Sequence, residues 1–259
     1  MIPQKPSVLV IIPARYASTR FPGKPLIDIH GKSMILRVCE QVQQVKNVSR
    51  IIVATDDDRI KAHVQSFGHE VMMTAEHHQS GTERCAEVTR NLPEKYDIVI
   101  NVQGDEPFIA PELIQQVIDG FDPEIQIVTV VKKIEEIEVL HSPNVVKAIF
   151  SEDQQAIYFS RHPIPYQRDA PINEWLLFAD YYKHIGIYGF THAELLKVVD
   201  LPLSPLESAE KLEQLRWLYY GSKIKVVITE HESIGIDTSE DLNKILSINK
   251  LQDEHYNKA

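Results

Sequence analysis

The sequence predicts an α/β protein built on one doubly wound, mostly parallel sheet. Strand-like runs alternate with helical runs over roughly the first 130 residues, which is the order expected of such a sheet. The strand-like runs are continuously apolar, as is typical of strands buried on both faces. Polar loops follow two of these runs. We expect the second half of the chain to extend the same sheet, which is then mixed, and to add a small sub-domain.

The first half begins with a predicted strand at Val8–Ile12, which is rich in β-branched residues and is ended by Pro13. A long polar loop follows, and Ser33 begins a helix whose apolar residues recur every three or four positions. Arg50–Ala54 completes this βαβ unit. The same patterns predict strands at Val71–Met73 and Asp97–Val102, and helices from a cap at Thr55 and Asp56 through Val64 and over Gly81–Leu92.

The second half is less regular. Its predicted strands are Ile127–Val131, Val145–Phe150, Ala156–Phe159, His184–Tyr188 and Ile224–Ile228. Its predicted helices are Pro111–Val117, Ala193–Val199, Pro205–Tyr219 and Ser239–Ile248. No repeat, low-complexity tract or linker interrupts the sequence. We therefore expect a single domain over residues 1–259, with one half at about 8–130 and another at about 131–250.

Composition excludes several classes of protein. With 43% hydrophobic and 25% charged residues in 259, the chain can bury a core without a disulfide or a structural metal. Cys39 and Cys85 lie in predicted helices and are expected to be buried thiols. A net charge of −10 disfavours nucleic acid as a partner. The apolar run Val8–Ile12 is too short to span a membrane, so we expect a cytoplasmic protein with no membrane partner.

Several short motifs imitate known sites but lack a required residue. His30–Ser33 resembles the end of a P-loop, yet Leu26 stands where that loop needs glycine. No GxGxxG follows the first strand, which disfavours a dinucleotide cofactor. Asp56–Asp58 resembles a calcium loop, but Lys61 replaces the required glycine, and helix capping explains these aspartates better. HExxH and GxSxG are both absent.

The loop Pro13–Pro25 carries three permanent cations, Arg15, Arg20 and Lys24, and no acid. It follows the first strand directly, so it lies at the carboxyl end of the sheet, where ligands of doubly wound proteins bind. Hydroxyl and backbone N–H groups of such a loop can bind polyphosphate oxygens while the cations neutralise their charge. An exposed basic loop would have the same composition, but its place in the predicted sheet favours the ligand-binding interpretation.

A second loop, Gln103–Pro107, follows the fourth predicted strand and places Asp105 beside a glycine. A carboxylate that faces a triphosphate-binding loop is suited to hold Mg²⁺. Asp237 is a second candidate for the same ion, because Thr238 or Ser239 can cap the final helix and leave it available. A turn-capping role would explain either aspartate alone.

The two polar loops are part of a set of short sequence blocks. The blocks are IIPARYASTRFPGKP at 11–25, VATD at 53–56, HQSGTER at 78–84, NVQGDEP at 101–107, YFSR at 158–161, HIGIYG at 184–189, PLE at 205–207, LEQLR at 212–216 and GID at 235–237. Taken together, they resemble the nucleotide-sugar cytidylyltransferases, within the type that acts on 3-deoxy-D-manno-octulosonate (Kdo). The resemblance follows the family's order from residue 8 to about 248.

The resemblance implies a fold of the nucleotide-diphospho-sugar transferase type and an enzyme that transfers CMP from CTP to the anomeric hydroxyl of Kdo. Pyrophosphate is released, and the product serves lipopolysaccharide biosynthesis. By similarity Arg15, Lys24 and Asp105 are catalytic, and Mg²⁺ is held by Asp105 and Asp237. The nucleotide-binding half is then 8–130. Its expected contacts to CTP are Ala14, Arg15, Arg20, Lys24, Gln79, Ser80, Gly81 and Arg84. For Arg84, a surface salt bridge with Glu83 or Glu87 is the alternative.

The second half is implied to bind the sugar and to form a homodimer. The expected sugar contacts are Gln103, Arg161, His184, Tyr188, Glu213 and Gln214. An exposed helix face explains Glu213 and Gln214 almost as well, and His184 fits a structural histidine. The segment from Arg161 onward varies among relatives, so 8-amino-Kdo or a sialic acid-like acceptor stays open. A non-catalytic nucleotide-sugar binding protein and a UTP- or GTP-dependent transferase are the alternatives of other kinds.

Overall fold

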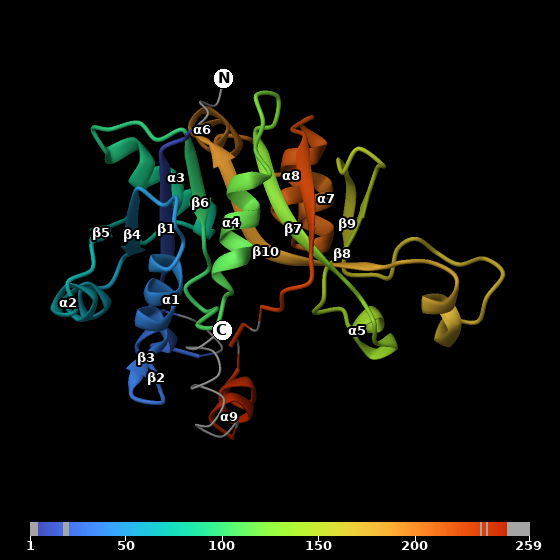
Figure 1. Cartoon of the computed structure of the whole chain (residues 1–259), viewed down its shortest axis with the longest axis horizontal. Helices are drawn as coiled ribbons and strands as arrows, with labels where there is room; N and C mark the ends of the chain where they lie inside the picture. The colour runs from blue at the N-terminus through green and yellow to red at the C-terminus, as the bar shows by residue number, and fades with distance from the viewer. Residues whose placement is uncertain (1–4, 18–20, 234, 237, 248–259) are drawn as a thin grey trace.

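The computed structural model describes residues 5–17, 21–233, 235, 236 and 238–247. A mixed sheet forms its centre, with nine strands among these residues. From edge to edge its main path is β11 (Ile224–Thr229), β7 (Ile127–Lys133), β10 (Tyr182–Thr191), β6 (Ile98–Asn101), β1 (Val8–Ala14), β4 (Arg50–Thr55) and β5 (Val71–Met73) (Figure 1).

Most of this path is parallel. β1 pairs in parallel with β4 and β6, β4 with β5, and β7 with β11. β10 is antiparallel to both of its neighbours, β6 and β7, and joins the strands of the first half to those of the second. The predicted mixed, mostly parallel sheet is therefore confirmed, and the second half does extend the sheet of the first.

Helices cover both faces of the sheet, because β1 alternates its side chains between two cores. Val8 and Val10 face a core shared with α1 (Met34–Gln43), α2 (Asp58–Ser66) and α4 (Pro111–Asp119). Leu9 and Ile11 face a core shared with α3 (Gly81–Asn91), α6 (His192–Val199) and α8 (Gln214–Tyr219). In Figure 1, α1 and α4 lie in front of the strands. The doubly wound arrangement is as predicted.

The second half also forms an arm that projects from one end of the sheet (Figure 1). β8 (Lys147–Phe150) pairs with the first residues of β10 and with β9 (Ala156–Ser160). Beyond them, α5 (Ile137–His141) and the 3-10 helix η2 (Ile172–Leu177) enclose a small core of their own. That core consists of Ile134, Leu140, Trp175 and Tyr181.

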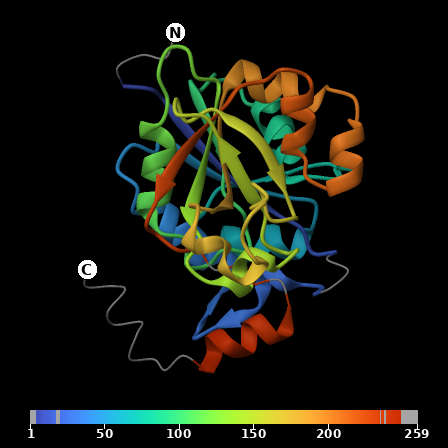
Figure 2. The same ribbon diagram turned by 90° about the vertical axis from the view of Figure 1, so that its right-hand side faces the viewer.

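The C-terminal helix α9 (Ser239–Ser247) packs below the sheet against the hairpin of β2 (Asp28–Ile29) and β3 (Lys32–Ser33) (Figure 2). Ile236 and Ile245 share a small core with Ile29 and Met34. The end of the described chain is thereby tied to the segment that follows the first polar loop. The hairpin and the short helix η1 (Lys24–Leu26) were not predicted, because each is only two or three residues long.

Two details of the predicted helices are wrong. The expected helix Pro205–Tyr219 is broken into α7 (Pro205–Glu210) and α8 by Lys211, whose φ of 56° ends the first helix. The expected cap of α2 is not Asp56, because the side chain of Asp57 accepts the hydrogen bond from the backbone N–H of Arg59. Both differences from the prediction concern polar side chains that belong to the site described below.

Both thiols are buried, as composition predicted: Cys39 and Cys85 have no exposed surface and form no disulfide. Burial raises the pKa of the Cys39 thiol to about 12. Within the part of the chain that the structure describes, no helix has the length and apolar character needed to cross a bilayer.

Candidate active site

A cavity of about 270 Å³ opens at the carboxyl ends of β1 and β6, where the doubly wound fold predicts a ligand. Three segments line it. They are the loop after β1, the start of α3 with the residues before it, and the loop after β6. Its lining residues are Pro13, Ala14, Arg15, Lys24, Pro25, His78, Gln79, Ser80, Gly81, Arg84, Gln103, Gly104 and Asp105.

The two polar loops that the sequence singled out lie against each other in this cavity. A Cβ atom added at Gly104 would stand 2.6 Å from the backbone oxygen of Pro13, which no side chain could tolerate without a shift. Glycine therefore allows the loop after β6 to approach the loop after β1. This approach brings Asp105 to the basic loop.

Lys24 and Asp105 form an ion pair, with 2.7 Å between Nζ and Oδ2. Both side chains line the cavity, where that of Lys24 is 11% exposed and that of Asp105 is 33% exposed. Arg15 lies at the exposed lip of the cavity and has no ion-pair partner among the described residues. Three of the charged groups that the sequence predicted are thus together. Arg20, the fourth, lies outside the described residues.

The loop after β1 is held in place by Tyr16. Its backbone oxygen accepts a 2.9 Å hydrogen bond from Gly23, and its ring packs where a Gly23 side chain would stand. The guanidinium of Arg59, on α2, lies over the same ring at 3.3 Å from its centre. Arg59 is in turn fixed by two bonds to Asp57. Sequence analysis did not identify Tyr16 or Arg59, because a cation–π contact between a loop and a distant helix leaves no local pattern.

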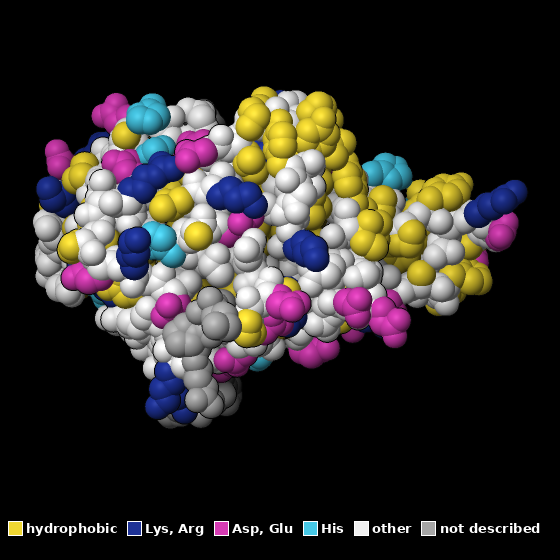
Figure 3. Space-filling model, turned by 90° about the horizontal axis from the view of Figure 1, so that it is seen from above, with side chains coloured by type: hydrophobic (Ala, Val, Ile, Leu, Met, Phe, Trp, Pro, Cys, Tyr) yellow, Lys and Arg dark blue, Asp and Glu magenta, His cyan; other side chains and the backbone are white. Residues whose placement is uncertain are grey.

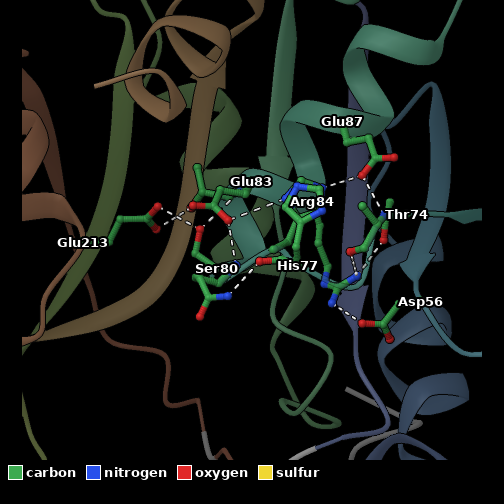
Figure 4. Close-up of polar contacts among 12 residues, drawn as sticks. Asp56, Thr74, His77, Ser80, Glu83, Arg84, Glu87 and Glu213 are labelled. Carbon is green, nitrogen blue, oxygen red and sulfur yellow. Dashed lines mark hydrogen bonds and ion pairs between the residues drawn. The ribbon is translucent and has the colours of Figure 1, made fainter. Parts of the chain in front are cut away.

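The segment before α3 is fixed by side chains of that same helix (Figure 4). Glu83 accepts a 2.7 Å hydrogen bond from the backbone N–H of Gln79. Glu87 accepts one of 2.9 Å from Ala75 and lies 2.5 Å from Nε2 of His78. His78 lines the cavity and was not predicted as a site residue, although it begins one of the blocks that carried the resemblance.

Arg84 is 3% exposed and reaches out of α3 toward the ends of two strands. Its NH1 group donates to Thr74 Oγ1 at 2.7 Å, and its NH2 group pairs with Asp56 (Figure 4). The alternative considered from sequence, a surface salt bridge with Glu83 or Glu87, is wrong, because both of these carboxylates bond the segment before the helix. Arg84 therefore lines the cavity as a buried, paired cation.

The structure describes one of the two predicted metal ligands. Asp105 lines the cavity, while Asp237 lies outside the described residues. The backbone N–H of Ile236 donates to the backbone oxygen of Asp105 at 3.0 Å, so the chain reaches Asp105 at position 236. No group of three or more His, Cys, Asp or Glu side chains suited to a metal occurs within the described part of the chain.

Of the six expected sugar-binding residues, Gln103 alone lines the cavity. Its amide nitrogen lies 3.4 Å from Asn101 Oδ1 and 3.5 Å from the backbone oxygen of Gly186, in β10. Gln103 therefore stands between the rest of the cavity and β10, the strand that carries His184 and Tyr188.

Tyr188 belongs to the core that contains Leu9 and Ile11, and the ring of His184 packs against that of Tyr188. Thr129 donates its hydroxyl proton to the backbone oxygen of Ile187, so it accepts from Nε2–H of a neutral His184 at 2.9 Å. The ring also packs edge-on against Phe159. Burial lowers the pKa of His184 to about 3 and raises that of Tyr188. His184 thus has the structural role that the sequence offered as the alternative to sugar binding.

Glu213 and Gln214 stand at the start of α8, and the exposed helix face considered for them is wrong. Gln214 is 5% exposed. Glu213 accepts hydrogen bonds from Ser80 Oγ at 2.9 Å and Thr82 Oγ1 at 2.7 Å, both at the start of α3 (Figure 4). Arg216 donates to the same carboxylate at 3.1 Å. Burial raises the pKa of Glu213, and the two hydroxyl groups oppose this rise. Glu213 thus joins the two halves of the chain.

Arg161 lies at the end of β9, outside the lining of the cavity. Its Nε donates to the backbone oxygen of Glu210 at 2.8 Å, and its NH1 donates to that of Pro143 at 3.0 Å. Beside it, the buried ammonium of Lys147 donates to three backbone oxygens, of Ser142, Val145 and Arg161. Burial lowers the pKa of Lys147 to about 8. Sequence analysis missed this buried lysine, since its strand is otherwise apolar.

Comparison with known proteins gives one consistent result. A family model described as cytidylyltransferase matches residues 9–224. The 3-deoxy-manno-octulosonate cytidylyltransferase of Parabacteroides distasonis is 51% identical over 242 residues, which cover 92% of this chain and 96% of that protein. The protein of the same name from Cytophaga hutchinsonii is 48% identical over 240 residues, with coverage of 92% and 96%.

Solved structures agree. A structure of CMP:2-keto-3-deoxy-manno-octonic acid synthetase complexed with CTP superposes with a TM-score of 0.87 at 39% identity, covering 96% of this chain and 99% of that one. The 4-diphosphocytidyl-2C-methyl-D-erythritol synthase of Anaerococcus prevotii, at 17% identity and a TM-score of 0.63, shares the fold. The chain therefore belongs to the cytidylyltransferase family, in the group of the 3-deoxy-manno-octulosonate cytidylyltransferases.

Proposed function

We propose that the chain is an enzyme that transfers CMP from CTP to the anomeric hydroxyl of Kdo and releases pyrophosphate. The observation that carries this proposal is the cavity in which Arg15, Lys24 and Asp105 meet the start of α3. The high identity to relatives named for this reaction over most of both chains supports it. The product would supply activated sugar for lipopolysaccharide, made in the cytoplasm.

The chemistry requires little of the protein beyond alignment and charge neutralisation. The anomeric hydroxyl of the sugar loses its proton to water as its oxygen attacks the α-phosphorus of CTP, a new P–O bond forms, and the bond from the α-phosphorus to the oxygen it shares with the β-phosphate breaks. Negative charge grows on the leaving pyrophosphate. Lys24 lies inside the cavity and Arg15 at its lip, so both can neutralise triphosphate oxygens there. Ala14, Gln79, Ser80, Gly81 and Arg84 would surround the cytosine end.

Asp105 fits a site for Mg²⁺, because its carboxylate faces the cavity and already balances a cation, the ammonium of Lys24. Carboxylate oxygens are the protein ligands that Mg²⁺ prefers. Asp237 is the second proposed ligand, on the grounds of sequence resemblance. When bound, the ion would neutralise phosphate oxygens and lower the pKa of the attacking hydroxyl.

The sugar would bind beside Gln103, on the side of the cavity that leads to β10 and α8. The proposed contacts are Gln103, Arg161, His184, Tyr188, Glu213 and Gln214. Because His184 is neutral and donates to Thr129, its remaining nitrogen can accept a hydrogen bond from a sugar hydroxyl.

We also propose a homodimer formed through the arm and the adjoining surface of β9 and α8. Hydrophobic side chains gather along this side of the molecule (Figure 3). The exposed large hydrophobic residues there include Ile157, Tyr166, Ile172, Leu177, Phe178 and Tyr219. A surface of this kind marks a protein–protein contact. Sedimentation should give twice the chain mass, and Leu177→Asp should shift the protein toward the monomer. A monomeric wild type at micromolar concentration would contradict the dimer.

The reaction is tested by pyrophosphate release from the purified protein with Mg²⁺. CTP, UTP and GTP are each combined with Kdo, 8-amino-Kdo or N-acetylneuraminate. We expect release with CTP and Kdo, and its loss in Asp105→Asn. Release with CTP and another acceptor only would change the sugar, while no release with any pair would refute the enzyme.

A further inference from the structure

Asp56 has no part in the reaction proposed above, and it does not cap a helix. It follows the last residue of β4, and α2 is capped by its neighbour Asp57. Among the described residues Asp56 has one bonded partner, the guanidinium of Arg84. The Asp56 side chain is 14% exposed and that of Arg84 is 4% exposed, so solvent screens this ion pair little.

This pair fixes the plane of the Arg84 guanidinium. NH2 bonds Asp56, and NH1 bonds both Thr74 Oγ1 at 2.7 Å and the backbone oxygen of Ala75 at 3.3 Å. Because a guanidinium is rigid and planar, holding both terminal nitrogens also sets the direction of its remaining N–H groups. Of five N–H groups, three are bonded, and no described residue accepts from the other two. They belong to a side chain that lines the cavity.

No neighbouring carboxylate can replace Asp56. Glu83 is bonded to the backbone of Gln79, and Glu87 to the backbone of Ala75 and to His78 (Figure 4). Without the Asp56 carboxylate, Arg84 would be a buried cation with no ionic partner, free to turn toward another acceptor. The orientation of Arg84 in the cavity therefore depends on Asp56.

A donor fixed in this way distinguishes cytosine from uracil. Cytosine presents two adjacent acceptors, O2 and N3, whereas N3 of uracil carries a hydrogen and is a donor. An N–H group aimed at N3 bonds cytosine and opposes uracil, and a site that leaves buried polar groups unpaired rejects the wrong ligand strongly. An arginine able to turn could instead donate to O4 of uracil, and the discrimination would be lost.

We propose that Asp56 is a positioning residue that sets the preference for CTP over UTP by holding Arg84 at the cavity. The proposal rests on the function proposed above, since it concerns recognition of the base in that reaction. A purely structural role for Asp56 would lower kcat/KM for CTP and UTP equally. The proposed role changes the ratio of kcat/KM between the two nucleotides.

The test compares Asp56→Asn with Asp58→Asn, a matched change two residues away on the exposed first turn of α2. For each protein, kcat/KM is measured with CTP and with UTP at saturating Kdo, and nucleotide affinity is measured by calorimetry without Kdo. We expect Asp56→Asn to lower the CTP-to-UTP ratio by about tenfold or more, as loss of a fixed hydrogen bond to the base would. Asp58→Asn should keep the wild-type ratio, and Asp56→Glu should recover part of it.

An unchanged ratio in a folded Asp56→Asn protein would overturn the proposal, as would an equal fall for both nucleotides. If Asp56→Asn does not fold, Thr74→Val removes a second bond to Arg84 while the ion pair stays, and it should lower the same ratio by less. An unchanged ratio in Thr74→Val would then overturn the proposal. Failure of the proposed function looks different, because wild-type protein would then release no pyrophosphate from CTP with Kdo, whatever its relative affinity for CTP and UTP in calorimetry.

Discussion

The two halves of the chain present their polar groups in opposite ways. In the first half, Arg15 and Lys24 of the loop after β1 and Asp105 of the loop after β6 converge on one cavity. In the second half, His184 bonds Thr129, and Arg161 bonds backbone oxygens of Glu210 and Pro143. The difference teaches that the groups of the first half already line an open cavity, while the groups proposed to bind the sugar are tied to the protein and would have to exchange contacts to do so.

The largest expected effect is on the nucleotide side. Lys24→Ala should lower kcat/KM for CTP by about 10²–10³-fold, the size expected when a group that stabilises transition-state charge is removed. Steady-state kinetics measures it. Lys32→Ala is the control, because that lysine is exposed and pairs with Glu40 on the surface. A fall of equal size in the control would mean that general charge, and not the cavity, governs CTP use.

The next effect concerns the bond between the halves. Glu213→Gln should raise KM for CTP by about tenfold, because the hydroxyls of Ser80 and Thr82 lose a charged acceptor at the start of α3. Glu210→Gln alters the same kind of contact inside the second half, where Glu210 accepts from Ser160 and Arg161. It should change KM for Kdo and leave KM for CTP unaltered. Equal changes in KM for CTP in Glu213→Gln and Glu210→Gln would contradict the assignment of CTP binding to the first half.

His184 predicts a pH dependence of stability. Its folded pKa of about 3 lies below the usual value of 6.5, so the unfolded chain binds a proton first as the pH falls. The free energy of unfolding should therefore decrease as the pH falls from about 6.5 toward 3, the window in which the unfolded chain binds this proton and the folded chain does not. Denaturant unfolding of His184→Gln should show a shallower dependence in that window. Parallel curves for both proteins would show that His184 is not buried and neutral.

The smallest effect is on the support of the first loop. Arg59→Ala removes the cation over the Tyr16 ring and should raise KM for CTP by about two- to fivefold, equivalent to the 0.5–1 kcal/mol of an exposed cation–π contact. Lys61→Ala, on the same helix, should leave KM for CTP as it is. If Arg59→Ala also leaves it unaltered, Tyr16 is positioned by its loop alone.

Local sequence patterns were enough to predict the central strands and the loops that follow them. Val8–Ile12 and Arg50–Ala54 are buried strands because their apolar runs suit both faces of a parallel sheet, and the loops after them follow from chain order. The ends of elements were less predictable. Asp56 and Asp57 fit a helix-capping pattern equally well in the sequence. They differ through a tertiary contact, because Asp56 pairs with Arg84 of α3 and Asp57 caps α2.

Long-range contacts account for what sequence could not predict. Lys211 ends α7 in a left-handed conformation that no local signal marks, and this break turns Glu213 toward Ser80, more than 100 residues away in sequence. The resemblance placed Glu213 and His184 in the site but could not show that each already has a partner. Tyr16 and Arg59 meet through tertiary packing alone.

The division between the halves is tested most directly by one pair of arginine variants. Calorimetric titration with CTP and Mg²⁺, without sugar, compares Arg15→Ala with Arg161→Ala. We predict that Arg15→Ala weakens CTP binding at least tenfold, since Arg15 lines the cavity, and that Arg161→Ala binds CTP as the wild type does. Equal weakening in both variants, or weakening in Arg161→Ala alone, would contradict a nucleotide site formed by the first half.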